Sequence, residues 1–183
     1  MNQSHGCLSR HEYQSPSFLD PKKDDVILDI GAGTGYISSK VCELCDEVYA
    51  LEPSVKKVEF IRRKFPQVKV FVGTCDKIPF PEFYFDKVFI ISAFHHFPDQ
   101  NDALEDISRV LKDDGLLLLQ ERNPRGVGVG QSLESIVAKN LVKFLRPYDL
   151  EDMVKRHRFM FESLDDGSTG YFLRARKTRT MTP

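Results

Sequence analysis

The chain has 183 residues, of which 41% are hydrophobic and 29% are charged, and its formal net charge is −1. These proportions are those of one folded globular domain with a single substantial core, and they exclude a largely disordered chain. A net charge close to zero gives no overall attraction to nucleic acid, so DNA is not an expected partner.

The sequence carries no secretory or membrane signal. No N-terminal stretch joins basic residues to an apolar core, and the longest apolar runs, Val88–Ile91 and Leu116–Leu119, are far shorter than the ~18 residues that span a bilayer. We expect a cytoplasmic protein without membrane insertion. The sequence gives no indication of the oligomeric state. A chain of this size gains no disulfide framework from four cysteines, which are Cys7, Cys42, Cys45 and Cys75.

Strands and helices alternate along most of the sequence. Short apolar runs bounded by turn residues predict strands, and apolar residues at helical spacing predict helices. In chain order, the predicted elements are strand Val26–Ile30, helix Tyr36–Leu44, strand Glu47–Leu51, helix Val55–Lys64, strand Val68–Val72, strand Lys87–Ile91, helix Asn101–Leu111, strand Leu116–Glu121, helix Ser132–Phe144, helix Tyr148–His157 and a hairpin of Phe159–Leu164 with Gly170–Arg176. The alternation predicts an α/β fold with a doubly wound, mostly parallel sheet and a C-terminal antiparallel hairpin.

A glycine-rich turn follows the first predicted strand. The segment Val26–Gly35 reads VILDIGAGTG, with three glycines at G-x-G-x-G spacing. Glycine allows a positive φ and lets backbone N–H groups approach a ligand, and open α/β sheets bind nucleotide-like ligands at such turns. The carboxylate of Asp29 would repel a pyrophosphate but attract an ammonium group. We therefore expect a ligand with a cationic end rather than a dinucleotide.

A second acid follows the second predicted strand. Glu52 lies about 20 residues after Gly31, the distance at which an acidic residue accepts hydrogen bonds from ribose hydroxyl groups. A ligand that combines an ammonium group, a ribose and an adenine ring is S-adenosylmethionine (SAM).

From Val26 to Gln120, the chain resembles the Rossmann-like SAM-dependent methyltransferases of the type 11 group, which includes the ubiquinone and menaquinone biosynthesis methyltransferases. The resemblance implies a seven-stranded sheet with an antiparallel last strand, SAM as the cofactor and S-adenosylhomocysteine (SAH) as the product. The segments that carry it are, in order, Val26–Gly35, Leu51–Ser54, Gly73–Phe80, Phe85–Ile90 with Ala93–Phe97, and Ala103–Leu118.

The resemblance also implies which residues hold the cofactor. Asp29 orients its amino group, Glu52 binds the ribose and Pro53 packs against the adenine. The expected set is Asp29, Ile30, Gly31, Ala32, Gly33, Gly35, Glu52, Pro53, Thr74, Cys75, Asp76 and Ser92.

Thr74 departs from the family pattern, because relatives carry at this position an acid that contacts the adenine amino group. Either Asp76 or the backbone of Thr74 and Cys75 replaces that contact, and the choice between them stays open.

A pair of histidines, His95 and His96, follows the fourth predicted strand at the sheet edge where ligands bind. Three roles stay open for the pair: pocket lining, general base and metal ligand. His95 is the candidate for the base, which methyl transfer needs only when the attacking atom must lose a proton. No metal is expected, because Cys42 and Cys45 supply only two of the four ligands that zinc needs.

The whole chain, residues 1–183, is expected to form one methyltransferase domain. Its predicted parts are a short N-terminal cap (1–25), a cofactor-binding core (26–121), a loop and helix that contribute to a substrate lid (122–148), and a C-terminal helix and hairpin (149–183). Within the lid, the glycine-rich segment Arg122–Gly130 is expected to act as a gate, with a flexible surface turn as the alternative.

The expected function is transfer of a methyl group to a small-molecule acceptor. Aromatic side chains of the loop Ser92–Phe97 would face the acceptor, and Tyr13, Phe18 and Tyr148 would close the other side. Nucleobase methylation is disfavoured, because this loop lacks the [D/N/S]-P-P-[Y/F] tetrapeptide and the chain has no Pro-Cys dipeptide.

Two alternative functions stay open. One is a methyltransferase that acts on protein or RNA and docks it on the basic residues Arg174, Arg176, Lys177 and Arg179. The other is a subunit that binds SAM without catalysis. The sequence does not specify the methyl acceptor or its attacking atom.

Overall fold

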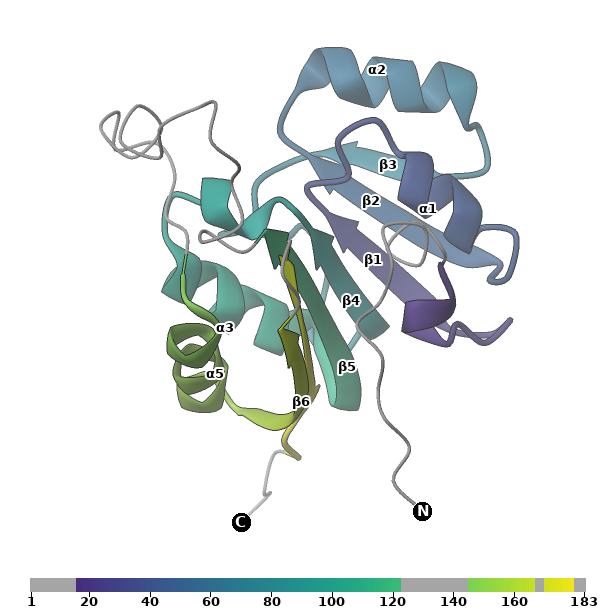
Figure 1. Ribbon diagram of the computed structural model, residues 1–183. Coiled ribbons are helices and arrows are strands. Elements are labelled where there is room, and N and C mark those ends of the chain that lie inside the picture. Colours follow the sequence, from purple (N-terminus) through teal and green to yellow (C-terminus); the bar gives the residue numbers. More distant parts are fainter. Residues whose placement is uncertain (1–15, 123–144, 167–169, 180–183) are drawn as a thin grey trace.

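Helices cover both faces of a single sheet (Figure 1). The computed structural model describes residues 16–122, 145–166 and 170–179. The elements are, in chain order, η2 (Pro16–Leu19), β1 (Val26–Ile30), α1 (Tyr36–Val41), β2 (Glu47–Glu52), α2 (Val55–Lys64), β3 (Lys69–Val72), β4 (Phe85–Ile91), η3 (Phe94–His96), α3 (Gln100–Val110), β5 (Leu111–Arg122), α5 (Pro147–Arg156), β6 (Phe159–Asp166) and β7 (Gly170–Lys177).

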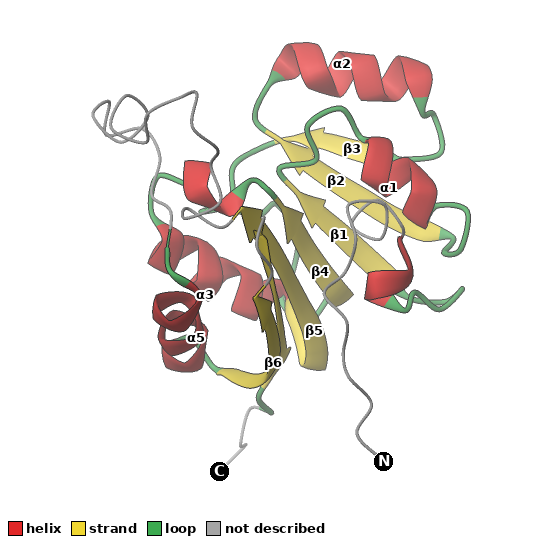
Figure 2. Ribbon diagram, viewed as in Figure 1, coloured by secondary structure: helices red, strands yellow, loops and turns green. Residues whose placement is uncertain are grey.

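The described strands form a seven-stranded sheet in the order β3-β2-β1-β4-β5-β7-β6. Figure 2 shows β3, β2, β1, β4 and β5 side by side. The pairs among β1 to β5 are parallel, and β7 runs antiparallel to both β5 and β6. This topology confirms the predicted doubly wound, mostly parallel sheet with a C-terminal antiparallel hairpin. The order reverses direction between β1 and β4, which is where ligands bind in open α/β sheets.

The core lies on both faces of the sheet because neighbouring residues of a strand point to opposite sides. On β1, Leu28 and Ile30 pack in the cluster that contains buried side chains of α3 and α5, whereas Ile27 packs with Val41 of α1 on the other face. Strands buried on both faces read as continuous apolar runs, as β1 does.

Several element bounds differ from the sequence prediction. Helix α1 ends at Val41 rather than Leu44, because the chain continues as a turn that brings Cys45 into the core. Strand β5 begins directly after α3, at Leu111 rather than Leu116. Its first residue pairs with Phe85, and the register shifts before the next pair, Lys87 with Leu116.

The predicted helix Ser132–Phe144, the segment Arg122–Gly130 beyond its first residue, and Tyr13 lie outside the described residues. Among the helices that are described, none has both the length and the apolar character needed to cross a membrane.

Candidate functional site

The three glycines of the turn after β1 all adopt a positive φ, which is 77° at Gly31, 59° at Gly33 and 73° at Gly35. A Cβ on Gly31 would lie 2.5 Å from the Cβ of Ala93, and a Cβ on Gly35 would lie 2.8 Å from a side-chain carbon of Ile61. On Gly33 it would meet only the carbonyl oxygen of Gly31, at 3.9 Å. The turn therefore packs closely against Ala93, which follows β4, and against α2, but it leaves room at Gly33.

Glu52 ends β2 with a buried side chain beside this turn. Its Oε2 accepts a hydrogen bond from the backbone N–H of Gly33 at 2.9 Å, and its Oε1 accepts one from the N–H of Ser54 at 3.1 Å. The ammonium group of Lys57 lies 3.5 Å from Oε1. Each carboxylate oxygen has two lone pairs, so Glu52 retains acceptor capacity for hydroxyl groups of a ligand.

Asp29 is buried near the end of β1, where its carboxylate accepts a hydrogen bond from the hydroxyl group of Ser38 on α1. Burial, together with the nearby negative charge of Glu52, raises the pKa of Asp29 to about 7, although the Ser38 hydrogen bond acts in the opposite direction. The carboxyl group therefore titrates near neutral pH.

A cleft of about 630 Å³ opens at the C-terminal ends of β1, β2 and β4. Its size is within the range of small-molecule pockets. The structure brings most of the expected cofactor residues together in its wall, namely Ile30, Gly31, Ala32, Gly33, Glu52, Pro53, Thr74, Cys75 and Ser92.

Four expected site residues do not line this cleft. Asp29 is buried on β1 against Ser38, and Gly35 is buried as the N-cap of α1 against Ile61. His95 is buried behind the cleft wall, and Asp76 lines a different groove. Of the two residue sets considered for the adenine contact, the structure thus brings Thr74 and Cys75 to the cleft.

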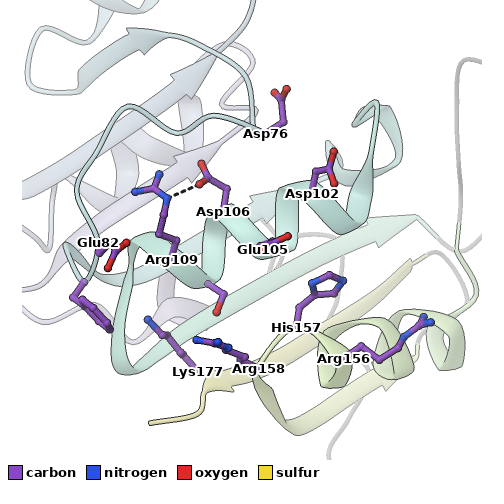
Figure 3. Close-up of a pocket in the computed structure, with 12 residues that line it drawn as sticks. Asp76, Glu82, Asp102, Glu105, Asp106, Arg109, Arg156, His157, Arg158 and Lys177 are labelled. Atoms are coloured by element: carbon purple, nitrogen blue, oxygen red, sulfur yellow. Dashed lines mark hydrogen bonds and ion pairs between the residues drawn. The ribbon is translucent and has the colours of Figure 1, made fainter. Parts of the chain in front are cut away.

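The groove that includes Asp76 has a volume of about 680 Å³ and runs along α3 (Figure 3). Asp102, Glu105 and Asp106 project from α3, while His157 and Arg158 come from the segment after α5. Its walls carry charges of both signs and contain none of the glycine turn.

One ion pair in this groove supports the loop between β3 and β4. The guanidinium group of Arg109 donates to Asp106 at 2.6 Å and to the backbone oxygens of Phe80 and Ile78 at 2.8 and 2.9 Å. Asp106 also accepts a hydrogen bond from the N–H of Ile78 at 2.5 Å. These bonds hold the loop that carries Thr74 and Cys75 against α3.

The two histidines after β4 point to different places. The ring of His95 is buried, and its Nδ1 lies 2.6 Å from Oε2 of Glu121 on β5. His96 is exposed and lines the cleft. The structure therefore brings His96, rather than His95, into the wall of the cleft.

Several lining residues were absent from the expected cofactor set, although His96 and Phe97 belong to the loop that was expected to face the acceptor. They are Leu51, Ser54, Lys57, Gly73, Ile91, Ala93, His96, Phe97 and Pro98. The signal for Ser54 and Lys57 was present in the sequence, because a helix that starts directly after Glu52 must present its first turn to the same sheet edge.

The aromatic residues expected around the acceptor separate in the structure. Phe94 and Phe97 are both buried in one core cluster, and of the two only Phe97 also lines the cleft. Phe18 packs against Phe89 and Phe172, with ring centroids 6.3 and 5.3 Å apart, and Tyr148 is exposed at the start of α5. Phe18 thus packs against the core and does not line the cleft.

The cysteine pair after α1 behaves as core rather than as a ligand pair. Cys45 is buried with its Sγ 2.9 Å from the backbone oxygen of Asp25, and burial raises the pKa of both Cys42 and Cys45. Within the described ranges, no three or more His, Cys, Asp or Glu side chains gather in a way that could hold a metal ion.

Comparison with known proteins gives a family match over the centre of the chain. Residues 28–119 match a family model described as a methyltransferase domain. An uncharacterized methyltransferase of Mycobacterium bovis is 29% identical over 115 residues, which cover 62% of this chain and 47% of that protein. This chain spans about half the length of the curated relatives that it matches.

Solved structures show the same fold at low identity. A Haloferax volcanii protein, described as a methyltransferase in complex with the Trm112 methyltransferase activator, has a TM-score of 0.79 at 17% identity, over 93% of this chain and 91% of that one. The YcgJ protein of Bacillus subtilis has a TM-score of 0.76 at 17% identity, over 93% and 100% of the two chains.

Proposed function

The chain belongs to the methyltransferase domain family, and on this basis we propose that it binds SAM and transfers the methyl group to a small-molecule acceptor. The proposal rests on one observation, the hydrogen-bonded contact between Glu52 and the glycine turn. A buried carboxylate and a turn with room at Gly33 line one cleft, at the point where the strand order reverses.

The residues of this cleft fit the parts of SAM. Glu52 offers acceptor lone pairs to the ribose hydroxyl groups, and the glycine turn admits the methionine portion without Cβ interference. Thr74 and Cys75 line the cleft where we place the adenine, with Pro53 beside it. Asp29 lies on β1 just before the turn, and in its ionised form its negative charge favours the ligand's ammonium group.

When bound, SAM would supply an electrophilic methyl group for in-line transfer to the acceptor, with SAH as the leaving group. The contribution of the chain is to orient an acceptor and exclude water. Ala93, Phe97 and Pro98 give the cleft an apolar wall after β4. Such a wall suits a neutral or weakly charged small molecule.

Methylation of protein or RNA is the second candidate, and the basic residues of β7 are less available for it than the sequence suggests. Arg174 and Arg176 both pair with Glu162, at 2.9 and 2.6 Å, and Arg179 pairs with Asp114 at 2.7 Å. Lys177 is buried and donates to the backbone oxygen of Leu111 at 2.7 Å. This pairing lowers the positive charge that a polyanion would need.

Calorimetry tests the cofactor assignment. We expect SAH and SAM to bind with one site per chain and NAD to give no signal. Equal binding of NAD, or no binding of SAH, would refute the proposal.

Labelling with tritiated SAM tests the acceptor class. A cell extract is incubated with the purified chain and separated into small-molecule, protein and RNA fractions, and we expect the label in the first. The extract also supplies any partner protein, which matters because one structural neighbour was solved with an activator. Label confined to protein or RNA would favour the second candidate, and SAH binding without any label would favour a non-catalytic subunit.

A further inference from the structure

A buried acid at the end of β5 has no part in the proposed cofactor contacts. Glu121 is 1% exposed. Its Oε2 lies 2.6 Å from Nδ1 of His95, and its Oε1 accepts a hydrogen bond from the backbone N–H of His95 at 3.3 Å. A buried carboxylate is stable only with such partners, and both of these bonds end on one residue, His95.

This pairing fixes the ring of His95. A carboxylate only accepts hydrogen bonds, so the proton lies on Nδ1 of His95, and the ring orientation follows from that bond. The rings of His95 and His96 are 4.0 Å apart between centroids, at an interplanar angle of 47°. Glu121 therefore orients His95, and the ring of His95 contacts the ring of His96, which lines the cleft.

The surroundings of His96 favour its neutral form. Partial shielding of the exposed ring from water and the neighbouring His95 lower the pKa of His96, with a smaller effect in the same direction from Lys57, while Glu121 acts in the opposite direction. A histidine with a lowered pKa is unprotonated at neutral pH and has a free ring nitrogen that can accept a proton. Its position in the cleft wall gives it access to a bound acceptor.

We propose that His96 is the general base of methyl transfer, that Glu121 and His95 are positioning residues for it, and that the acceptor carries a hydroxyl or N–H group at the attacking atom. This inference rests on the proposed function. It specifies the acceptor class, because a carboxylate, a thioether or a tertiary amine attacks without losing a proton and needs no base.

Methyl transfer and loss of the acceptor's proton occur at the same acceptor atom. The acceptor oxygen or nitrogen forms a bond to the methyl carbon as the carbon–sulfur bond breaks, and the electron pair of that bond stays on sulfur. The acceptor's proton passes to the free ring nitrogen of His96. The imidazolium then releases the proton to water, and the neutral ring is restored.

The first test is an NMR titration of the full chain with labelled histidine, with and without SAH. We expect the ring signal of His96, assigned by its loss in His96→Gln, to titrate below the ordinary histidine pKa of about 6.5. Replacing Glu121 by Gln removes the charge that raises this pKa, so the titration should move further down. A His96 that titrates above the ordinary value would overturn the proposal.

The second test measures transfer of tritiated methyl to the labelled acceptor fraction as a function of pH. We expect the wild-type rate to rise with pH through the measured pKa of His96. His96→Gln should lower the rate by about 100-fold or more and abolish that rise, while SAH binding stays within about twofold. In His96→Gly, which opens the base position, added imidazole should restore part of the rate. His157→Gln, a change in the separate groove along α3, is the matched control and should leave the rate unchanged.

Glu121→Gln separates positioning from mere support of the fold. We expect a lower kcat at unchanged SAH affinity, with the acid limb of the pH profile moved to lower pH. A Glu121 that only stabilised the fold would lower the melting temperature and leave the limb in place, which would refute its positioning role.

The outcomes also separate this inference from the proposed function. Normal rate and pH profile in His96→Gln, with SAH bound and acceptor methylated, would overturn only the inference. A wild-type chain that binds no SAH or labels no fraction would overturn both.

Discussion

The carboxylate of Glu52 and the backbone N–H of Gly33 are joined by a hydrogen bond of 2.9 Å that connects the ends of β2 and β1. The residue proposed to bind the ribose thus also holds the glycine turn in place. A second backbone contact, from the N–H of Gly31 to the oxygen of Leu51 at 2.8 Å, ties the same two segments together. Cofactor affinity and turn geometry should therefore respond together to changes at Glu52.

Removing the carboxylate in Glu52→Ala should weaken SAH binding by about 1–3 kcal/mol, because ribose hydroxyls and two backbone N–H groups lose an acceptor. Glu52→Gln keeps one acceptor oxygen, so its SAH affinity should lie between those of Glu52→Ala and the wild type. Calorimetry with SAH measures the effect. Glu47→Gln, an acid at the opposite end of β2, is the control with the same change and should bind SAH normally. Equal affinity in Glu52→Ala and wild type would remove Glu52 from the cofactor site.

Gly31→Ala and Gly33→Ala should differ in stability although both residues adopt a positive φ. The backbone strain costs about 1 kcal/mol at either position. Only Ala at 31 meets a side chain, the Cβ of Ala93 at 2.5 Å, and overpacking of this kind adds about 1–3 kcal/mol.

The free energy of unfolding in urea measures this difference. Adding Ala93→Gly should recover most of the extra cost of Gly31→Ala, compared with Ala93→Gly alone. If both glycine variants lose equal stability, the close approach of Gly31 to Ala93 does not govern the turn.

Asp29 should make the fold less stable as pH rises from about 4 to about 7. Its pKa is raised to about 7 in the folded chain from an ordinary value of 3.8, so within this window the native state binds more protons than the unfolded chain. The free energy of unfolding then decreases with pH, by up to about 1.4 kcal/mol per unit. Asp29→Asn cannot titrate and should lose this slope.

Chemical denaturation at several pH values compares Asp29→Asn with the wild type. Asp24→Asn, which neutralises an exposed acid just before β1, is the control for the loss of one charge. Parallel pH profiles for wild type and Asp29→Asn would contradict the assigned cause.

Arg109→Met should loosen the loop that carries Thr74 and Cys75. The change removes three donors, to Asp106, Phe80 and Ile78, and leaves two backbone oxygens without that partner. The expected loss of stability is about 1–3 kcal/mol. Hydrogen exchange should show faster exchange at residues 76–80.

The matched control is Arg179→Met, because the Arg179–Asp114 pair is exposed and such pairs contribute at most about 1 kcal/mol. Equal effects of the two changes would show that Arg109 acts only through surface charge.

The elements with a strong local pattern could be predicted from the sequence. Strand β1 and helix α2 have the predicted bounds, because an apolar run that ends in glycine and an amphipathic run capped by Ser54 each depend on their own residues. The start of β5 depends on a distant partner, since Leu111 joins the sheet only by pairing with Phe85. Such a contact has no local signal.

The site was predictable to the level of segments rather than of single side chains. The spacing of Gly31 and Glu52 located the cleft, but the choice between His95 and His96 depends on the short helix η3 and on Glu121, which is far away in sequence. In the same way, only the path of the loop after β3 separates Cys75, which faces the cleft, from Asp76, which does not.

The place of β7 has a consequence for synthesis of the chain. β7 is the last described strand in sequence, yet it lies between β5 and β6. While the nascent chain leaves the ribosome, β1 to β5 can assemble, but one edge of β5 stays open until residues 170–177 emerge. Because Glu121 and Tyr171 are register partners, the burial of Glu121 is completed only then. Until that moment the apolar segment Leu116–Leu119 is an unpaired edge that a chaperone or another nascent chain can bind.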